Sequence, residues 1–289
     1  MGLWISGPYL AALAHWQPEA GGSVYTYEAM LPYLHLFNHN VPTFGLMLWL
    51  AAVTGAWLMD RAFRRARVEA DAVGFVAITV VMGIVGAKLW HVLDTPYEFH
   101  IQGWSVLWDS AGFAWFGGLV LGIAALMFQG WWAKVGCLKT LDLASAAAAV
   151  GYGIGRIGCL LSGDGCYGIQ TSLPWGMAFP NGIEATPPGV RVHPTPIYEL
   201  IAALLIGAWL WWRGGKRHSP GSIVGQYLVL MGIARFLVEF LRRNPKVLWG
   251  LSNAQLASLG SVVAGLVLVA WATWRGTHGA AAATLAEAE

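Results

Sequence analysis

The stretch AVGFVAITVVMGIVGAKLWHV at residues 72–92 decides the fold class of this chain. It contains one charged side chain, Lys88, among apolar and small residues. About 20 consecutive apolar residues in a helix are enough to cross the roughly 30 Å hydrocarbon core of a bilayer. Residues 72–92 are therefore predicted to form a transmembrane helix.

Six further apolar runs of comparable length lie on either side of this stretch. They cover approximately residues 41–59, 113–131, 141–162, 196–212, 221–241 and 251–272. The whole chain is 57% hydrophobic and only 11% charged, whereas soluble domains average roughly 25% charged residues. The sequence therefore predicts an all-α integral membrane protein of about seven transmembrane helices, in one transmembrane domain over residues 41–272.

The loops between these runs differ in positive charge. One side carries Arg61, Arg64, Arg65, Arg67, Lys134, Lys139, Arg213, Lys216, Arg217 and Arg275. The other side carries only Arg191, Arg242, Arg243 and Lys246. Because cytoplasmic loops are enriched in Lys and Arg, the first side is predicted to be cytoplasmic. The N-terminus is then outside, with residues 1–40 as an interfacial segment and 163–195 as an extracytoplasmic loop domain, and 273–289 form a cytoplasmic tail.

Several functional classes are disfavoured by the same composition. The three cysteines, Cys137, Cys159 and Cys166, lack paired zinc-ligand spacing, and we predict no metal site and no cofactor. With a net charge of +2 and no long basic run, nucleic acid is not expected as a partner. Residues 153–158 spell G-x-G-x-x-G, but they lie in an apolar run without a preceding strand, which argues against a dinucleotide site.

Two arginines, Arg156 and Arg235, fall inside predicted spans near their outer ends. An ionised arginine within a span costs a few kcal/mol, so it usually faces a partner, a cavity or a ligand. A cationic pocket for an anionic lipid headgroup is one interpretation. The other is that both arginines snorkel, or pair with the acidic residues Asp164, Glu199 or Glu239.

The loop 163–195 begins Gly163-Asp164-Gly165-Cys166-Tyr167-Gly168 and leads into His193-Pro194-Thr195-Pro196-Ile197-Tyr198-Glu199. Its glycines allow backbone amides to approach a ligand closely, and its prolines restrict the entry to the next helix. Together with Arg156 just upstream, and with Arg235 and Glu239 one helical turn apart, it indicates a polar site.

Four separated blocks carry a resemblance to a known family. They are GRIGCLLSGD at 155–164, LPWGMAFP at 173–180, HPTPIYE at 193–199 and RFLVEFLR at 235–242. Looser similarity occurs at 86–89, 116–119 and 251–255, so that most of residues 41–270 is covered. In these blocks the chain resembles the bacterial prolipoprotein diacylglyceryl transferases.

The resemblance implies an enzyme of the bacterial inner membrane that moves a diacylglyceryl group from phosphatidylglycerol to the lipobox cysteine of a prolipoprotein signal peptide. A thioether forms and glycerol phosphate is released. The expected partners are therefore phosphatidylglycerol, other membrane lipids and prolipoproteins. Arg156 and Arg235 match the family's essential arginines, with Glu239 and Arg242 as supports. The residues expected to bind substrate are Arg156, Arg235, Arg242, Gly168, Tyr198 and Glu199.

The chain also departs from the family's pattern. Phe116 and Phe44 occupy positions where the family commonly has a histidine and an aromatic hydroxyl, and neither phenylalanine can transfer a proton. Asp164, His193, Glu199 and Glu239 are the candidates to accept the proton instead. His193 is favoured because its ordinary pKa lies near neutrality, although bonding to backbone alone would also explain it.

These departures leave two alternative functions open. One is a non-catalytic phosphatidylglycerol-binding protein that kept the headgroup arginines and lost turnover, and the other is a transferase with a different acceptor. Cys159 replaces the family's usual asparagine and Asp164 its usual glutamate, and both cysteines of this region, Cys159 and Cys166, are expected to be ordinary packing residues.

Overall fold

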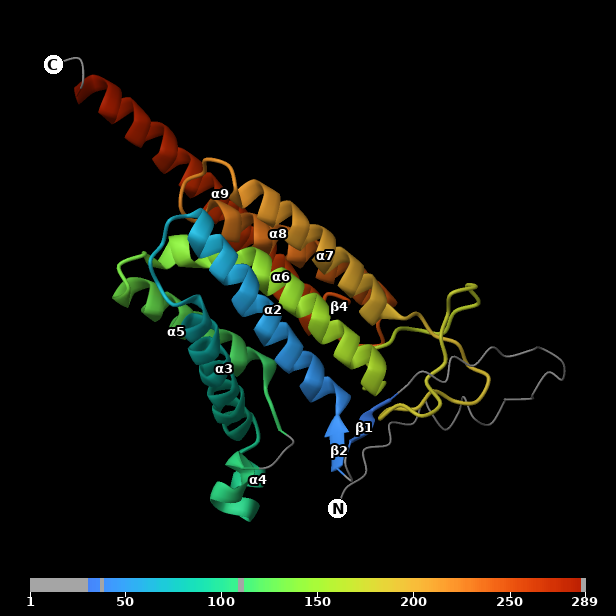
Figure 1. The fold of residues 1–289 in the computed structure, drawn as a ribbon. Helices are drawn as coiled ribbons and strands as arrows, with labels where there is room; N and C mark the ends of the chain where they lie inside the picture. The colour runs from blue at the N-terminus through green and yellow to red at the C-terminus, as the bar shows by residue number, and fades with distance from the viewer. Residues whose placement is uncertain (1–30, 37–38, 109–111, 287–289) are drawn as a thin grey trace.

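The computed structural model describes residues 31–36, 39–108 and 112–286, and within these ranges it is a bundle of long helices (Figure 1). The helices are α2 (Thr43–Arg65), α3 (Ala72–Asp94), α5 (Trp115–Trp132), α6 (Cys137–Ser162), α7 (Thr195–Gly214), α8 (Ser222–Val238) and α9 (Asn253–Ala286). In the described part of the chain, seven helices are long and apolar enough to cross a membrane. The predicted class, an all-α membrane protein with about seven spans, is confirmed.

Two helices extend beyond their predicted ends. Helix α2 continues to Arg65 rather than ending near residue 59, and Arg64 in its last turn pairs with Asp60 at 2.8 Å. Pairs at this i, i+4 spacing stabilise an exposed helical turn. Helix α9 continues to Ala286, through most of the segment predicted as a tail, and its final turns are rich in alanine, the strongest helix former.

Because successive helices run in opposite directions, their connections gather at two ends of the bundle. The basic face is formed by residues 66–71, 133–136 and 215–221. The signature face is formed by residues 95–108, 112–114, 163–194 and 242–252. Figure 1 shows the long yellow connection of residues 163–194 at one end and the C-terminus beyond the other.

Helix α6 lies between α2 and α7, where small residues permit close packing. A Cβ atom at Gly153 would be 3.3 Å from Cβ of Ala203 in α7. On the other side of α6, a Cβ atom at Gly158 would be 3.0 Å from the ring of Phe44 in α2. The density of small residues in the fourth span thus serves close helix packing.

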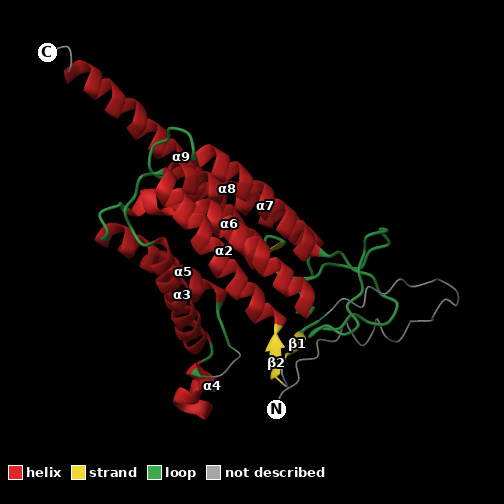
Figure 2. Ribbon diagram, in the orientation of Figure 1, coloured by secondary structure: helices red, strands yellow, loops and turns green. Residues whose placement is uncertain are grey.

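Short elements lie beside the long helices at the signature-face end of the bundle (Figure 2). They are the antiparallel pair β1 (Tyr33–Leu36) and β2 (His39–Pro42), helix α4 (Pro96–Gln102), the 3-10 helices η1 (Gly103–Leu107) and η2 (Glu239–Leu241), and the antiparallel pair β3 (Lys246–Leu248) and β4 (Leu251–Ser252). None was predicted from the sequence. Most of the predicted interfacial segment 1–40, namely residues 1–30 and 37–38, lies outside the described residues.

The connection 163–194 has its own small core. Tyr167 stacks on Phe179 with ring centroids 4.8 Å apart, and Val192 packs against both. Backbone hydrogen bonds tie this core to the bundle, since the Ile169 amide donates to the Leu241 carbonyl at 2.8 Å. The segment is therefore an ordered layer over the helix ends.

Candidate functional site

Three arginines from separate elements surround one buried carboxylate, Glu199, just after the first turn of α7. Arg156 of α6 places Nε 3.4 Å from Oε2, and Arg242, just after η2, places Nη1 3.4 Å from the same oxygen. Arg235 of α8 places Nη1 3.1 Å from Oε1. We call Arg156, Arg235, Arg242, Glu199 and Glu239 the arginine cluster.

The second carboxylate of the arginine cluster, Glu239, forms ion pairs with two of these arginines. Its Oε2 lies 2.8 Å from Nη2 of Arg235 and 3.7 Å from Nε of Arg242. The Ser252 hydroxyl donates to Oε1 at 2.7 Å. Ser252 of β4, in the segment 251–255 where the family resemblance was loose, thus supports the arginine cluster from just before α9.

Charge and exposure give the arginine cluster a direction. The Glu199 and Glu239 side chains are 2% and 0% exposed, whereas the guanidinium-bearing side chains of Arg156 and Arg235 are 18% and 23% exposed. Three permanent cations face two carboxylates, which leaves one positive charge uncompensated. The predicted pairing of arginines with Glu199 and Glu239 is therefore present, and the partly open arginines can still bind an anion.

Tyr152 joins the arginine cluster without having been predicted. Its hydroxyl donates to Oε1 of Glu199 at 2.7 Å and accepts from Nη2 of Arg156 at 2.9 Å. Its position one helical turn before Arg156 is the only signal the sequence offered. A cavity beside Tyr152 and Arg235 measures about 10 Å³, which is room for about one water molecule. An anion larger than a water molecule would therefore reach the guanidiniums from their exposed side.

The two cysteines of the signature region face Arg156, which the packing interpretation did not anticipate. Nη1 of Arg156 lies 3.7 Å from Sγ of Cys159 and 3.8 Å from Sγ of Cys166. Oδ1 of Asp164 accepts from the Cys166 amide at 3.1 Å, and potential ligand atoms of all three residues lie within 4.8 Å of one another. A hydrogen bond from Cys159 lowers the pKa of Cys166, and the charge of Arg242 acts in the same direction.

His193 belongs to a separate group beside the arginine cluster. Its Nδ1 lies 3.2 Å from the Tyr198 hydroxyl, which also accepts a hydrogen bond from Nε1 of Trp175 at 2.8 Å. Within the described ranges, no hydrogen bond or ion pair joins these side chains directly to the arginine cluster. His193 therefore bonds a side chain, contrary to the interpretation in which it serves the backbone alone.

Gly168 brings the loop to the arginine cluster by its lack of a side chain. Its amide donates to the His193 carbonyl at 2.8 Å, and it bridges to Arg242 in antiparallel fashion. A Cβ atom there would clash with the Leu241 carbonyl and lie 2.9 Å from Cβ of His193. The glycine is thus required by close backbone approach rather than by its dihedral angles.

The two phenylalanines at family polar positions occupy different surroundings. Phe44 contacts the Gly158 surface of α6, two residues beyond Arg156. Phe116 is 50% exposed in the first turn of α5, next to Gly117, which packs on Gly86 of α3. Neither side chain can accept a proton.

Comparison with known proteins agrees with this architecture. Residues 32–271 match the prolipoprotein diacylglyceryl transferase family. The chain is 32% identical over 240 residues to phosphatidylglycerol–prolipoprotein diacylglyceryl transferase 2 of Clostridium perfringens, covering 81% of this chain and 91% of that protein. It is 32% identical to the phosphatidylglycerol–prolipoprotein diacylglyceryl transferase of Clostridium tetani, covering 80% and 93%, and 29% identical to that of Leptospira interrogans, covering 83% and 93%.

The family match covers the seven membrane-spanning helices up to residue 271 and includes every residue of the arginine cluster. The relatives align over most of both chains, so that the similarity is not confined to one motif. This multi-pass membrane protein belongs to the prolipoprotein diacylglyceryl transferase family.

Proposed function

We propose that this chain transfers the diacylglyceryl group of phosphatidylglycerol to the lipobox cysteine of prolipoproteins. The observation that carries the proposal is the arginine cluster, in which Arg156, Arg235 and Arg242 surround Glu199 with one positive charge left over. The phosphodiester of phosphatidylglycerol carries one negative charge. Guanidinium groups match phosphate oxygens in geometry as well as charge, and their effect is greatest where water is excluded.

The reaction forms one bond and breaks one. The sulfur of the acceptor cysteine attacks the carbon of the diacylated glycerol that is bonded to the phosphate oxygen, and a C–S thioether bond forms. The C–O bond to the phosphate breaks, its electron pair leaves with the oxygen, and glycerol phosphate departs. Arg156 and Arg235 stabilise the charge that accumulates on the departing phosphate. The thiol proton must leave before or during attack, because thiolate is the nucleophile.

His193 is the proposed proton acceptor. It lies half-buried on the signature face, and its Nδ1 is oriented by the Tyr198 hydroxyl at 3.2 Å, which leaves Nε2 for another partner. Orientation of one imidazole nitrogen by a hydrogen bond is usual where the other transfers a proton. Asp164, beside Cys166, is the next candidate, since Glu199 and Glu239 are occupied by arginines.

Replacement of His193 by Gln is expected to lower the transfer rate about a hundredfold, which is the lower end of the range for general-base catalysis. Initial rates with a lipobox peptide would measure this. Tyr198→Phe, which keeps the imidazole but removes its hydrogen bond, should reduce the rate less. An unchanged rate in the His193 variant would point to Asp164.

The proposed location is the bacterial inner membrane, with the signature face outside and the basic face in the cytoplasm. It rests on the unequal distribution of Lys and Arg between the two faces. Single cysteines are introduced at exposed Ser172 and exposed Glu69, in a background in which Cys137, Cys159 and Cys166 are replaced by serine. The two positions should differ in their reaction with a thiol reagent. In intact cells an impermeant thiol reagent should label only position 172. Labelling of position 69 instead would reverse the orientation.

Transfer itself is tested with purified protein, phosphatidylglycerol and a synthetic lipobox peptide. The peptide mass should rise by one diacylglyceryl group, with release of glycerol phosphate, and a peptide with serine in place of its cysteine should stay unmodified. Retained phosphatidylglycerol without transfer would favour the non-catalytic binding protein, which Phe44 and Phe116 make the second candidate. Transfer to a different thiol substrate would mean that the chain is a transferase with another acceptor than the prolipoproteins proposed.

A further inference from the structure

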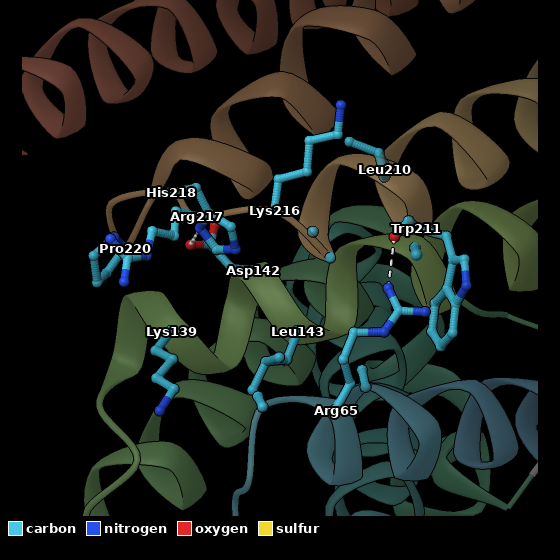
Figure 3. Close-up of a pocket in the computed structure, with 15 residues that line it drawn as sticks. Arg65, Lys139, Asp142, Leu143, Leu210, Trp211, Lys216, Arg217, His218 and Pro220 are labelled. Atoms are coloured by element: carbon cyan, nitrogen blue, oxygen red, sulfur yellow. Dashed lines mark hydrogen bonds and ion pairs between the residues drawn. The ribbon is translucent and has the colours of Figure 1, made fainter.

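A large cavity lies at the basic face, at the opposite end of the bundle from the arginine cluster. It measures about 510 Å³ and is bordered by α2, α6, α7 and the connection to α8. Figure 3 shows Arg65 and Trp211 on one side of it and Lys139, Arg217 and His218 on the other. No step of the proposed transfer uses this cavity.

The charge around the cavity is strongly unbalanced. Four permanent cations line it, namely Arg65, Lys139, Lys216 and Arg217, against the single carboxylate of Asp142. That carboxylate is already compensated, because it accepts backbone hydrogen bonds from the first turn of α8: Gly221 at 2.7 Å and Val224 at 2.7 Å. The protonated form of His218, 3.7 Å away, would compensate it further. The cavity therefore presents an uncompensated positive field.

The cations differ in how far the protein already uses them. Arg65 donates from Nη1 to the Trp211 carbonyl at 2.8 Å and stacks on the Trp211 ring at 4.0 Å. Lys216 lies over the Trp212 ring at 3.4 Å. The side chains of Lys139 and Arg217 are exposed and form no hydrogen bond or ion pair with any residue that the structure describes. These two remain available to an external anion.

The walls of the cavity are apolar as well as cationic. Leu143 of α6, Leu210 of α7 and the Trp211 side chain line it beside the charged groups. The cavity also lies at the ends of helices that are long and apolar enough to span a membrane, where the headgroups of a bilayer would meet such helices. A free phosphate ion gains nothing from contact with apolar walls. A phospholipid headgroup with the first methylenes of its acyl chains can contact both the cationic and the apolar side chains. Basic pockets between transmembrane helices are known to suit such headgroups.

We propose that this cavity is a second anion site, which binds the phosphate headgroup of an anionic phospholipid from the leaflet at the basic face. Lys139 and Arg217 bind the phosphate, Arg65 and Trp211 form a fixed wall, and the apolar side chains contact the start of the acyl chains. The site is separate from the arginine cluster and does not depend on the transfer reaction.

The test uses phosphatidic acid with a photoreactive group near its headgroup, in phosphatidylcholine vesicles that contain the full-length protein. Crosslinked peptides are mapped by mass spectrometry. We expect crosslinks to residues 139–146 and 210–220, and about a tenfold loss in the double variant Lys139→Gln, Arg217→Gln at low lipid. The matched control, Arg67→Gln with Lys134→Gln, removes one arginine and one lysine from exposed positions of the same face outside the cavity, and should crosslink like the wild type.

Competition distinguishes the source of the phosphate. Unlabelled phosphatidic acid should abolish the crosslinks, whereas phosphatidylcholine, glycerol phosphate and inorganic phosphate at equal concentration should not. Competition by the soluble phosphates would overturn the lipid assignment and leave a soluble anion as the occupant. Equal losses of crosslinking in the two double variants would show that general surface charge, and not the cavity, attracts the lipid. The absence of crosslinks to residues 139–146 and 210–220 would refute the site.

Discussion

Replacing Arg156 or Arg235 by alanine is expected to slow diacylglyceryl transfer about a hundredfold or more. Each change removes a preorganised donor from the phosphate that departs, and the loss of one such donor typically costs on the order of 3 kcal/mol in the transition state. Both side chains are mostly buried, so water would replace them poorly. Initial rates with a lipobox peptide at saturating phosphatidylglycerol would measure the effect.

Lysine at either position should recover only part of the rate. It restores the charge but not the planar fork of donors that fits a phosphate or carboxylate. Arg61→Ala, which removes an exposed arginine on the basic face, serves as the control and should transfer at the wild-type rate. If the two alanine variants stay folded in detergent and also match the wild type, the arginines are structural and the proposed mechanism is wrong.

Neutralising Glu199 is expected to produce the largest loss of stability. In Glu199→Gln, Arg156, Arg235 and Arg242 retain their charges with only Glu239 to compensate them. Removing one partner of a buried ion pair typically costs about 3–5 kcal/mol, because the remaining charge stays desolvated. The thermal unfolding midpoint in detergent should fall strongly, and added phosphatidylglycerol should restore more stability than it adds to the wild type, since its phosphate replaces the missing charge.

Glu184→Gln provides the matched comparison. The Glu184 side chain is 63% exposed and its carboxylate lies 3.9 Å from Arg243 on the same face. Exposed pairs contribute at most about 1 kcal/mol, so this variant should unfold close to the wild-type midpoint. Similar midpoints for both variants would mean that Glu199 does not carry the electrostatic balance of the arginine cluster.

The sequence alone determined the class of fold and the residues of highest interest. Apolar runs of spanning length predict transmembrane helices directly, because within lipid a single segment can form all its backbone hydrogen bonds only as a helix. Arg156 and Arg235 were identified by the cost of charge within a span. Helix ends were less certain: polar and alanine-rich turns continued α2 to Arg65 and α9 to Ala286, where hydropathy gives no signal.

Only the tertiary structure decided which partners these arginines have. Glu199 and Arg242 are 43 positions apart in the chain, and whether their side chains meet depends on how α7 and α8 pack. The same packing placed Glu199 against Tyr152, which lies one helical turn from Arg156 on α6, and the loop brought Cys166 to Arg156. His193 lies beside Tyr198 instead. The packing also formed the basic cavity from Lys139 and Arg217, which in the sequence looked like ordinary loop charges. A pattern along one chain records local periodicity and the solvent of each segment, but distances between segments arise from side-chain packing among helices, which no single segment specifies.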